Sequence, residues 1–180
     1  MTDTFDCFKA YDVRGRIPDQ LNETIARQIG QAYAEVIDPG TVVVGHDIRL
    51  TSERIKAALI DGLREQGVSV QDIGLCGTEE IYFATAHLGV GGGIVVTASH
   101  NPKDYNGFKM VLAGRAIYGE DIQALRATMT DESWVLRAGG QVRLMNILKP
   151  YSDRIIGDVR LSRPMKIVMD SGNGVAGASA

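Results

Sequence analysis

The chain has 180 residues, of which 44% are hydrophobic and 23% charged, which suits one ordinary folded domain with room for part of a second. Lys and Arg total 19 against 22 Asp and Glu, so the net charge of −3 argues against nucleic-acid binding through bulk positive charge. No apolar run approaches the ~20 residues of a membrane span, and residues 1–8 lack a secretory pattern, so we expect no contact with a membrane. The two cysteines are far apart and outside any CxxC spacing, which predicts reduced thiols and a cytoplasmic protein.

Hydrophobic periodicity predicts alternating helices and strands after a turn region around Gly15. Helical spacing of apolar residues, with Asn22 as an N-cap and either Thr51 or Ser52 as another, predicts helices at 22–37, 52–66, 78–88 and 121–129. Short β-branched or apolar runs predict strands at 41–46, 68–73, 92–97 and 108–112.

The order of these elements predicts the fold class. The strand at 108–112 follows 92–97 too closely for a parallel crossover, so we expect it to return antiparallel. The β-α-β-α-β order with this return strand predicts an α/β fold, a three-layer α/β/α sandwich with a mixed, mostly parallel sheet. Right-handed crossovers would bring the loops after the parallel strands to one edge of that sheet.

The pattern weakens beyond residue 131. We expect a loose hairpin or connector at 138–144, a helix at 151–159 and a strand at 166–170. A strand followed by half a helical turn cannot bury its own faces, which predicts a first domain at 1–148, a connecting helix and linker at 149–164, and the truncated start of a second α/β domain at 165–180. An unpaired strand there leaves two outcomes open, disorder or self-association with a second copy.

The segment TASHNPKDYNGFK at 97–109 directly follows a predicted strand and holds the densest cluster of reactive side chains. Ser99 is its candidate nucleophile. A serine in a polar loop is more commonly just solvated, and the flanking residues do not form the G-x-S-x-G elbow of serine hydrolases. Residue types alone therefore leave catalysis and a plain solvated loop both open.

Four motifs together carry a resemblance. They are KAYDVRG at 9–15, GHDIRLTS at 45–52, TASHNP at 97–102 with a lysine ten residues after the serine, and DSGNGVAG at 170–177. In this order they resemble the α-D-phosphohexomutases, and the first motif is similar to the phosphomannomutase/phosphoglucomutase branch. A phosphoglucosamine mutase would instead show a form like GTDGIRG at that place.

The resemblance implies a phosphoryl-transfer chemistry. Ser99 would be a phosphoserine that donates its phosphoryl group to a hexose 1- or 6-phosphate of mannose or glucose. The hexose 1,6-bisphosphate that forms would then return a phosphoryl group from its other end. Mg²⁺ would bind the oxygen or phosphate of Ser99 and offset the charge of the transferring group.

The resemblance also implies roles for neighbouring residues. Lys109 matches the proposed general acid or base, and His100 matches a second candidate for handling the proton. Arg14 would bind phosphate through its guanidinium, Tyr11 would line the cleft, and Asn101 would contact substrate or phosphate.

Each of these residues also has a purely structural explanation. Arg14 could form a surface pair with Asp12, Tyr11 could belong to the core, and Lys109 could face solvent from an alternating strand. Asp47 and Arg49 are expected to brace the first of the strand-to-helix loops without a catalytic role.

The glycines at 172–177 fit the pattern G-x-G-x-x-G, which also occurs at dinucleotide sites. The resemblance instead implies that they form the first turn of a second domain, so NAD binding comes third, behind a mutase and a non-catalytic binding module. The family's D-G-D-x-D-R metal loop is absent from the sequence. We therefore expect an N-terminal piece of a mutase that is inactive alone, and the competing class is a non-catalytic module that binds an anion or a partner through Ser99, Lys103 and Lys109.

Overall fold

A mixed β-sheet forms the centre of the protein in a computed structural model that describes residues 5–112 and 115–179. In this part of the chain seven strands form one sheet in the order β1-β5-β4-β2-β3-β7, and β6 pairs with β5. The strands are β1 (Val13–Arg16), β2 (Thr41–His46), β3 (Ser69–Leu75), β4 (Gly92–Val96), β5 (Tyr105–Leu112), β6 (Arg115–Ala116) and β7 (Val142–Leu144).

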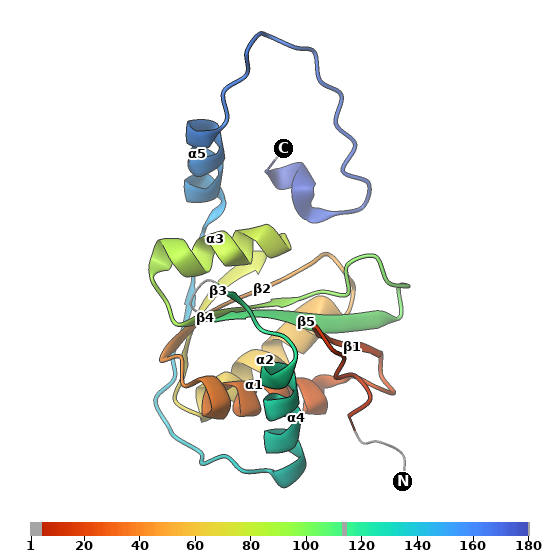
Figure 1. Cartoon of the computed structure of the whole chain (residues 1–180), viewed down its shortest axis with the longest axis vertical. Coiled ribbons are helices and arrows are strands. Elements are labelled where there is room, and N and C mark those ends of the chain that lie inside the picture. The colour runs from red at the N-terminus through yellow and green to blue at the C-terminus, as the bar shows by residue number, and fades with distance from the viewer. Residues whose placement is uncertain (1–4, 113–114, 180) are drawn as a thin grey trace.

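Helices cover both faces of this sheet, as Figure 1 shows. They are α1 (Glu23–Ile37), α2 (Ser52–Glu65), α3 (Thr78–Leu88), α4 (Glu120–Asp131), α5 (Leu148–Asp158) and the short 3₁₀ helix η1 (Val175–Ala178). α1, α2 and α4 lie on one face, while α3 lies on the other with α5 beyond it (Figure 1). The predicted three-layer α/β/α fold is confirmed.

The central strands are buried on both faces, which explains their continuous apolar sequences. In β2, Val42 and Val44 pack into the larger core under α1, α2 and α4, whereas Val43 packs into the smaller core under α3. β2 pairs in parallel with both β3 and β4, and β5 returns antiparallel to β4 as expected. The carboxyl ends of β2, β3 and β4 therefore lie along one edge.

Local signals set several helix boundaries. The side chain of Asn22 accepts a hydrogen bond of 3.1 Å from the backbone N–H of Ile25, so the predicted N-cap of α1 is confirmed. α2 has Thr51 as its N-cap residue, yet neither Thr51 nor Ser52 caps the helix with its side chain. Ser52 donates instead to Asp47, which lies in the loop before the helix.

Three expectations about irregular segments were wrong. The turn expected around Gly15 is the antiparallel strand β1, whose residue Arg14 lies opposite Gly107 of β5. The expected hairpin or connector at 138–144 contains β7, which extends the sheet in parallel beside β3. Residues 166–170 form no strand and are exposed, because no described strand lies beside them to complete a hydrogen-bonded ladder.

The chain continues past α5 in an extended path that returns to η1 on the α3 side of the sheet (Figure 1). Within the described residues, no helix is long and apolar enough to cross a membrane.

Candidate active site

A cleft of about 1320 Å³ lies at the carboxyl edge of the parallel strands. The loops that follow β2, β3 and β4 line it, at residues 47–51, 76–79 and 97–104, and residues 173–176 lie across from them. This is the edge where the strand order predicts a binding site in an open α/β sheet.

Ser99 is presented at this cleft in an unusual backbone conformation. The chain leaves β4 through the buried residues Thr97 and Ala98, and Ser99 and His100 are the first exposed residues. Ser99 has a φ of 51°, the left-handed region that few residues other than glycine adopt without cost. Its hydroxyl oxygen lies 3.4 Å from Nδ1 of His100, so an imidazole nitrogen lies beside the candidate nucleophile.

The carboxylate of Asp47 joins the loops after β2 and β4. Its Oδ2 accepts a hydrogen bond of 2.7 Å from the hydroxyl of Thr97, and its Oδ1 accepts from the hydroxyl of Ser52 at 2.6 Å and from the N–H of Arg49 at 3.0 Å. The Thr97 oxygen in turn accepts a 2.9 Å hydrogen bond from the N–H of Ser99. A polar chain thus runs from the start of α2 to the backbone of Ser99.

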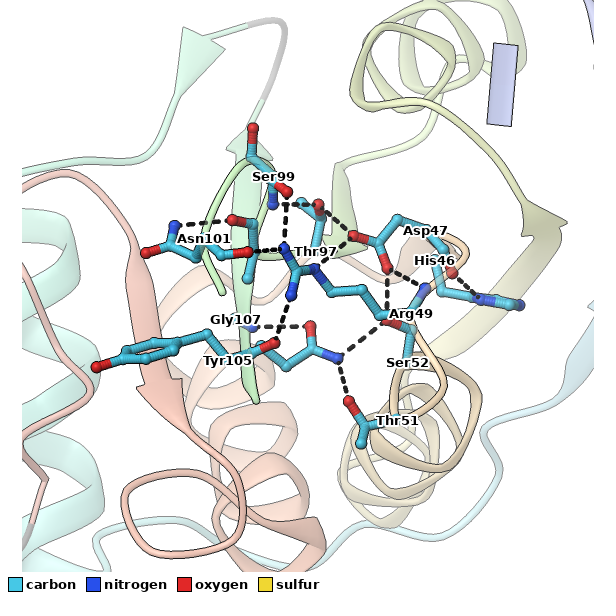
Figure 2. Close-up of polar contacts among 12 residues, drawn as sticks. His46, Asp47, Arg49, Thr51, Ser52, Thr97, Ser99, Asn101, Tyr105 and Gly107 are labelled. Atoms are coloured by element: carbon cyan, nitrogen blue, oxygen red, sulfur yellow. Dashed lines mark hydrogen bonds and ion pairs between the residues drawn. The ribbon is translucent and has the colours of Figure 1, made fainter. Parts of the chain in front are cut away.

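The guanidinium of Arg49 binds the loop between β4 and β5, residues 97–104, which we call the serine loop. Nη2 donates to the carbonyl oxygens of Ser99 at 2.8 Å and Asn101 at 2.6 Å, and Nη1 donates to those of Pro102 at 2.7 Å and Tyr105 at 3.0 Å. Figure 2 shows the guanidinium between the carbonyls of Ser99, Asn101 and Tyr105. Sequence reasoning expected Arg49 to brace only its own loop, and its contacts with the serine loop were missed because its partners are carbonyl oxygens.

The other predicted site residues divide into two groups. Asn101 lies in the serine loop, where its side chain donates to the carbonyl of Ala98 at 2.8 Å and closes the turn. Lys109 is half-buried in β5, opposite Val95 of β4, and Val95 itself lines the cleft. Lys109 thus lies next to the cleft wall without being among the lining residues.

Tyr11 and Arg14 lie before and within β1, outside the residues that line the cleft. Tyr11 is 79% exposed, so the alternative that it belongs to the core is wrong. Arg14 contacts the carboxylate of Asp12 at 2.5 Å, as its structural explanation supposed, and its main chain pairs with Gly107 of β5, the strand after the serine loop.

The donor set does not form a magnesium site by itself. The described residues contain no group of three or more His, Cys, Asp or Glu side chains placed to hold a metal ion. Asp47 is linked to Ser99 through the hydroxyl of Thr97. Both oxygens of its carboxylate already accept hydrogen bonds from hydroxyl or backbone donors. The Ser99 hydroxyl is one oxygen ligand, whereas Mg²⁺ demands an octahedral set.

The glycine pattern at 172–177 lacks the context of a dinucleotide fingerprint. Such a fingerprint needs a strand before the glycines and a full helix after them. Here 166–170 is not a strand, and η1 spans only 4 residues. This segment forms one wall of the cleft and offers no helix N-terminus of useful length.

Comparison with known proteins supplies the deciding observation. The model of the family "Phosphoglucomutase/phosphomannomutase, alpha/beta/alpha domain I" matches residues 6–135. The chain belongs to this family. A phosphomannomutase of Escherichia coli is 52% identical over 179 residues, covering 95% of this chain and 39% of the relative, and one of Vibrio cholerae is 47% identical over 183 residues with the same coverage.

Solved structures agree with this membership. A phosphoglucomutase/phosphomannomutase family protein from Burkholderia thailandensis superposes with a TM-score of 0.89 at 44% identity, covering 98% of this chain and 40% of that one. The chain therefore spans about two fifths of the length of the phosphohexomutases it matches. Its described fold is the α/β/α domain of a family of mutases.

Proposed function

We propose that this chain carries the nucleophile of a phosphohexomutase that interconverts hexose 1-phosphates and hexose 6-phosphates of mannose, glucose or both. Membership of the family supports a mutase. The observation that carries the proposal is Ser99 itself, exposed at the cleft in a left-handed conformation, with the carbonyl of Ser99 and the N–H of Ser99 both hydrogen-bonded.

In the proposed cycle, phosphorylated Ser99 donates its phosphoryl group to a hydroxyl of the sugar phosphate, and the O–P bond to serine breaks as the O–P bond to sugar forms. The bisphosphate reverses its orientation, and the free Ser99 hydroxyl then attacks the other phosphorus, whose O–P bond to the sugar breaks and leaves a sugar hydroxyl. His100, whose Nδ1 lies 3.4 Å from the serine oxygen, is proposed to take and return the serine proton. Lys109 is proposed to exchange the proton of the sugar hydroxyl.

Both transfers connect oxygens of similar energy, so the remaining tasks are positioning and charge neutralisation. We propose that Arg14, Tyr11 and Asn101 contact substrate when the sugar phosphate is bound, that these sugar phosphates are the protein's partners, and that the protein works in the cytoplasm. Mg²⁺, which supplies charge neutralisation when bound, would take the Ser99 oxygen as one ligand. Its other ligands would have to come from groups other than a cluster of the described residues, which contain no group of three or more His, Cys, Asp or Glu side chains placed to hold a metal ion.

The test is a chimera in which this chain replaces the matching two fifths of the E. coli phosphomannomutase. We expect mutase turnover and a phosphorylated Ser99 peptide by mass spectrometry. Ser99→Ala should lower turnover by a thousandfold or more, on the order seen when a nucleophile is removed, and abolish the phosphopeptide. The control is Ser133→Ala, which changes an exposed serine away from the cleft and should leave both signals intact.

Full turnover by the Ser99→Ala chimera would exclude the proposed nucleophile. A chimera with native Ser99 that binds hexose phosphate without turning it over would favour the competing function, a non-catalytic anion-binding module.

A further inference from the structure

We infer that Arg49 is a positioning residue for phosphoryl transfer at Ser99, an inference that rests on the proposed function. Arg49 lies in the loop after β2, fifty residues from the serine in sequence. It touches only the backbone of the serine loop, so its role would be to fix the direction in which the nucleophile points.

The backbone of Ser99 is held on both sides. Its N–H donates to the Thr97 hydroxyl at 2.9 Å, and its carbonyl accepts from Arg49 at 2.8 Å. Because the two peptide units that flank a residue define its φ and ψ, fixing both fixes the direction of the Cα–Cβ bond. The left-handed φ of 51° is a costly conformation, and it persists only where surrounding contacts determine it.

The serine loop is held by hydrogen bonds more than by apolar packing. Besides the contacts of Arg49, the carbonyl of Asp104 accepts from the N–H of Ile17 at 2.7 Å, and Asn101 bonds back to the carbonyl of Ala98. Ser99, His100, Pro102, Lys103 and Asp104 are all exposed, so no apolar packing compensates for lost hydrogen bonds. Four carbonyls from residues 99–105 converge on one guanidinium whose side chain is only 14% exposed. Hydrogen bonds to a charged donor are stronger than neutral ones, and partial burial strengthens them further.

The geometry requires arginine in particular. Only the guanidinium presents a planar fork of five N–H donors, whereas a lysine ammonium has three donors at one point. The fork itself is aligned by Asp47, whose Oδ1 accepts from the backbone N–H of Arg49 at 3.0 Å and whose Oδ2 lies 3.5 Å from Nε. Asp47 also accepts a hydrogen bond from the Thr97 hydroxyl, so one carboxylate orients both side chains that bind the backbone of Ser99.

This arrangement matters for transfer because the serine must meet phosphorus in line twice in each cycle. A misplacement of about 1 Å can cost a hundredfold in rate. Arg49 lines the cleft, but both of its Nη nitrogens already donate to carbonyls of the chain, so we expect its loss to lower kcat and leave KM nearly unchanged.

The experiment uses Arg49→Met and Arg49→Lys in the active chimera, with Arg54→Met as the matched control. Arg54 is an exposed arginine of α2 that pairs with Glu23 and does not line the cleft. We expect kcat to fall about a hundredfold for both Arg49 variants with KM changed less than about threefold, and no change for the control. Thr97→Val should lower kcat similarly, whereas Thr97→Ser, which keeps the hydroxyl, should restore it.

A second readout follows the loop without catalysis. In the 180-residue chain, Arg49→Met should speed hydrogen exchange at the Ser99 amide at least about tenfold, while amides of β4 keep their protection. Unchanged kcat in Arg49→Met, or a purely raised KM, would overturn the inference, as would unchanged exchange at Ser99. A wild-type chimera without turnover would instead contradict the proposed function, and the exchange measurement would still decide whether Arg49 holds the loop.

Discussion

At the scale of single residues, the two cysteines make the stability of the protein depend on pH. Both are free and buried in the core. Loss of hydration raises the pKa of the Cys7 thiol from 9.0 to about 11 and that of the Cys76 thiol from 9.0 to about 12. The folded protein therefore keeps both thiols neutral, and Cys76 is no nucleophile although it lines the cleft.

Because the thiol pKa values are higher in the folded protein than in the unfolded chain, we predict a loss of stability at alkaline pH. Unfolded thiols ionise near pH 9 while folded ones stay protonated, so the unfolded state releases protons first and stability falls as pH rises from 9 towards 11. We expect the free energy of unfolding to drop by about 1 kcal/mol for each cysteine between pH 8 and pH 10. Urea unfolding under reducing conditions measures it, and the double variant Cys7→Ala, Cys76→Ala should show a shallower decline. Equal declines in both proteins would contradict the assignment.

At the scale of elements, two glycines let α1 and α2 pack closely. A Cβ on Gly62 would lie 2.0 Å from the carbonyl oxygen of Arg27, and a Cβ on Gly30 would lie 2.4 Å from that of Leu59. Glycine in a helix interior costs about 1 kcal/mol relative to alanine. At these two positions, however, the absence of a Cβ allows the two helix backbones to approach each other closely.

Gly62→Ala should therefore destabilise the protein despite its better helix propensity. We expect a loss of about 1–3 kcal/mol in the free energy of unfolding, because the helices must separate. The control is Gly157→Ala in α5, where the new Cβ meets nothing within 4 Å and should cause no loss. Equal midpoints of urea unfolding for the two variants would show that the helix contact is not constrained.

Sequence reasoning predicted the helices and strands whose signals lie in their own residues. Central strands such as β2 are buried on both faces and carry continuous β-branched residues, and α1 carries its own capping residue. β1 was missed because its sequence VRGR has arginine and glycine at alternate positions, and it is a strand only through its pairing with β5. Conversely, 166–170 has strand composition without a described neighbour to pair with.

The candidate site follows the same division. The position of Ser99 at the carboxyl edge of the sheet was predictable, because its loop directly follows a predicted strand, whereas its role as a nucleophile stays a prediction that rests on the motifs. The hydrogen bonds of Arg49 to residues 99–105 were not predictable, because its four acceptors are backbone carbonyls, which every residue possesses. Only the folded loop shows that they converge on one guanidinium.

At the scale of the whole molecule, the cleft has charged side chains from one set of loops. The three strand-end loops supply the proposed nucleophile and its supports, and among the described residues the rest of the lining is Val95 and residues 173–176. That segment carries no charged side chain, so it offers no carboxylate to a metal ion and no cation to a sugar phosphate. The charged side chains that the described residues place around this cleft therefore all belong to the strand-end loops.

The 180-residue chain alone should consequently show no mutase turnover above background when given Mg²⁺, a hexose 1-phosphate and a trace of hexose 1,6-bisphosphate. In-line phosphoryl transfer needs charge neutralisation around the transferring group, and the described residues hold no cluster that could retain the metal. The assay follows formation of hexose 6-phosphate, with the chimera as the positive control at equal concentration. Turnover by the chain that disappears in Ser99→Ala would mean that this cleft assembles a working site by itself, and the metal ligands would then have to be sought among its own residues.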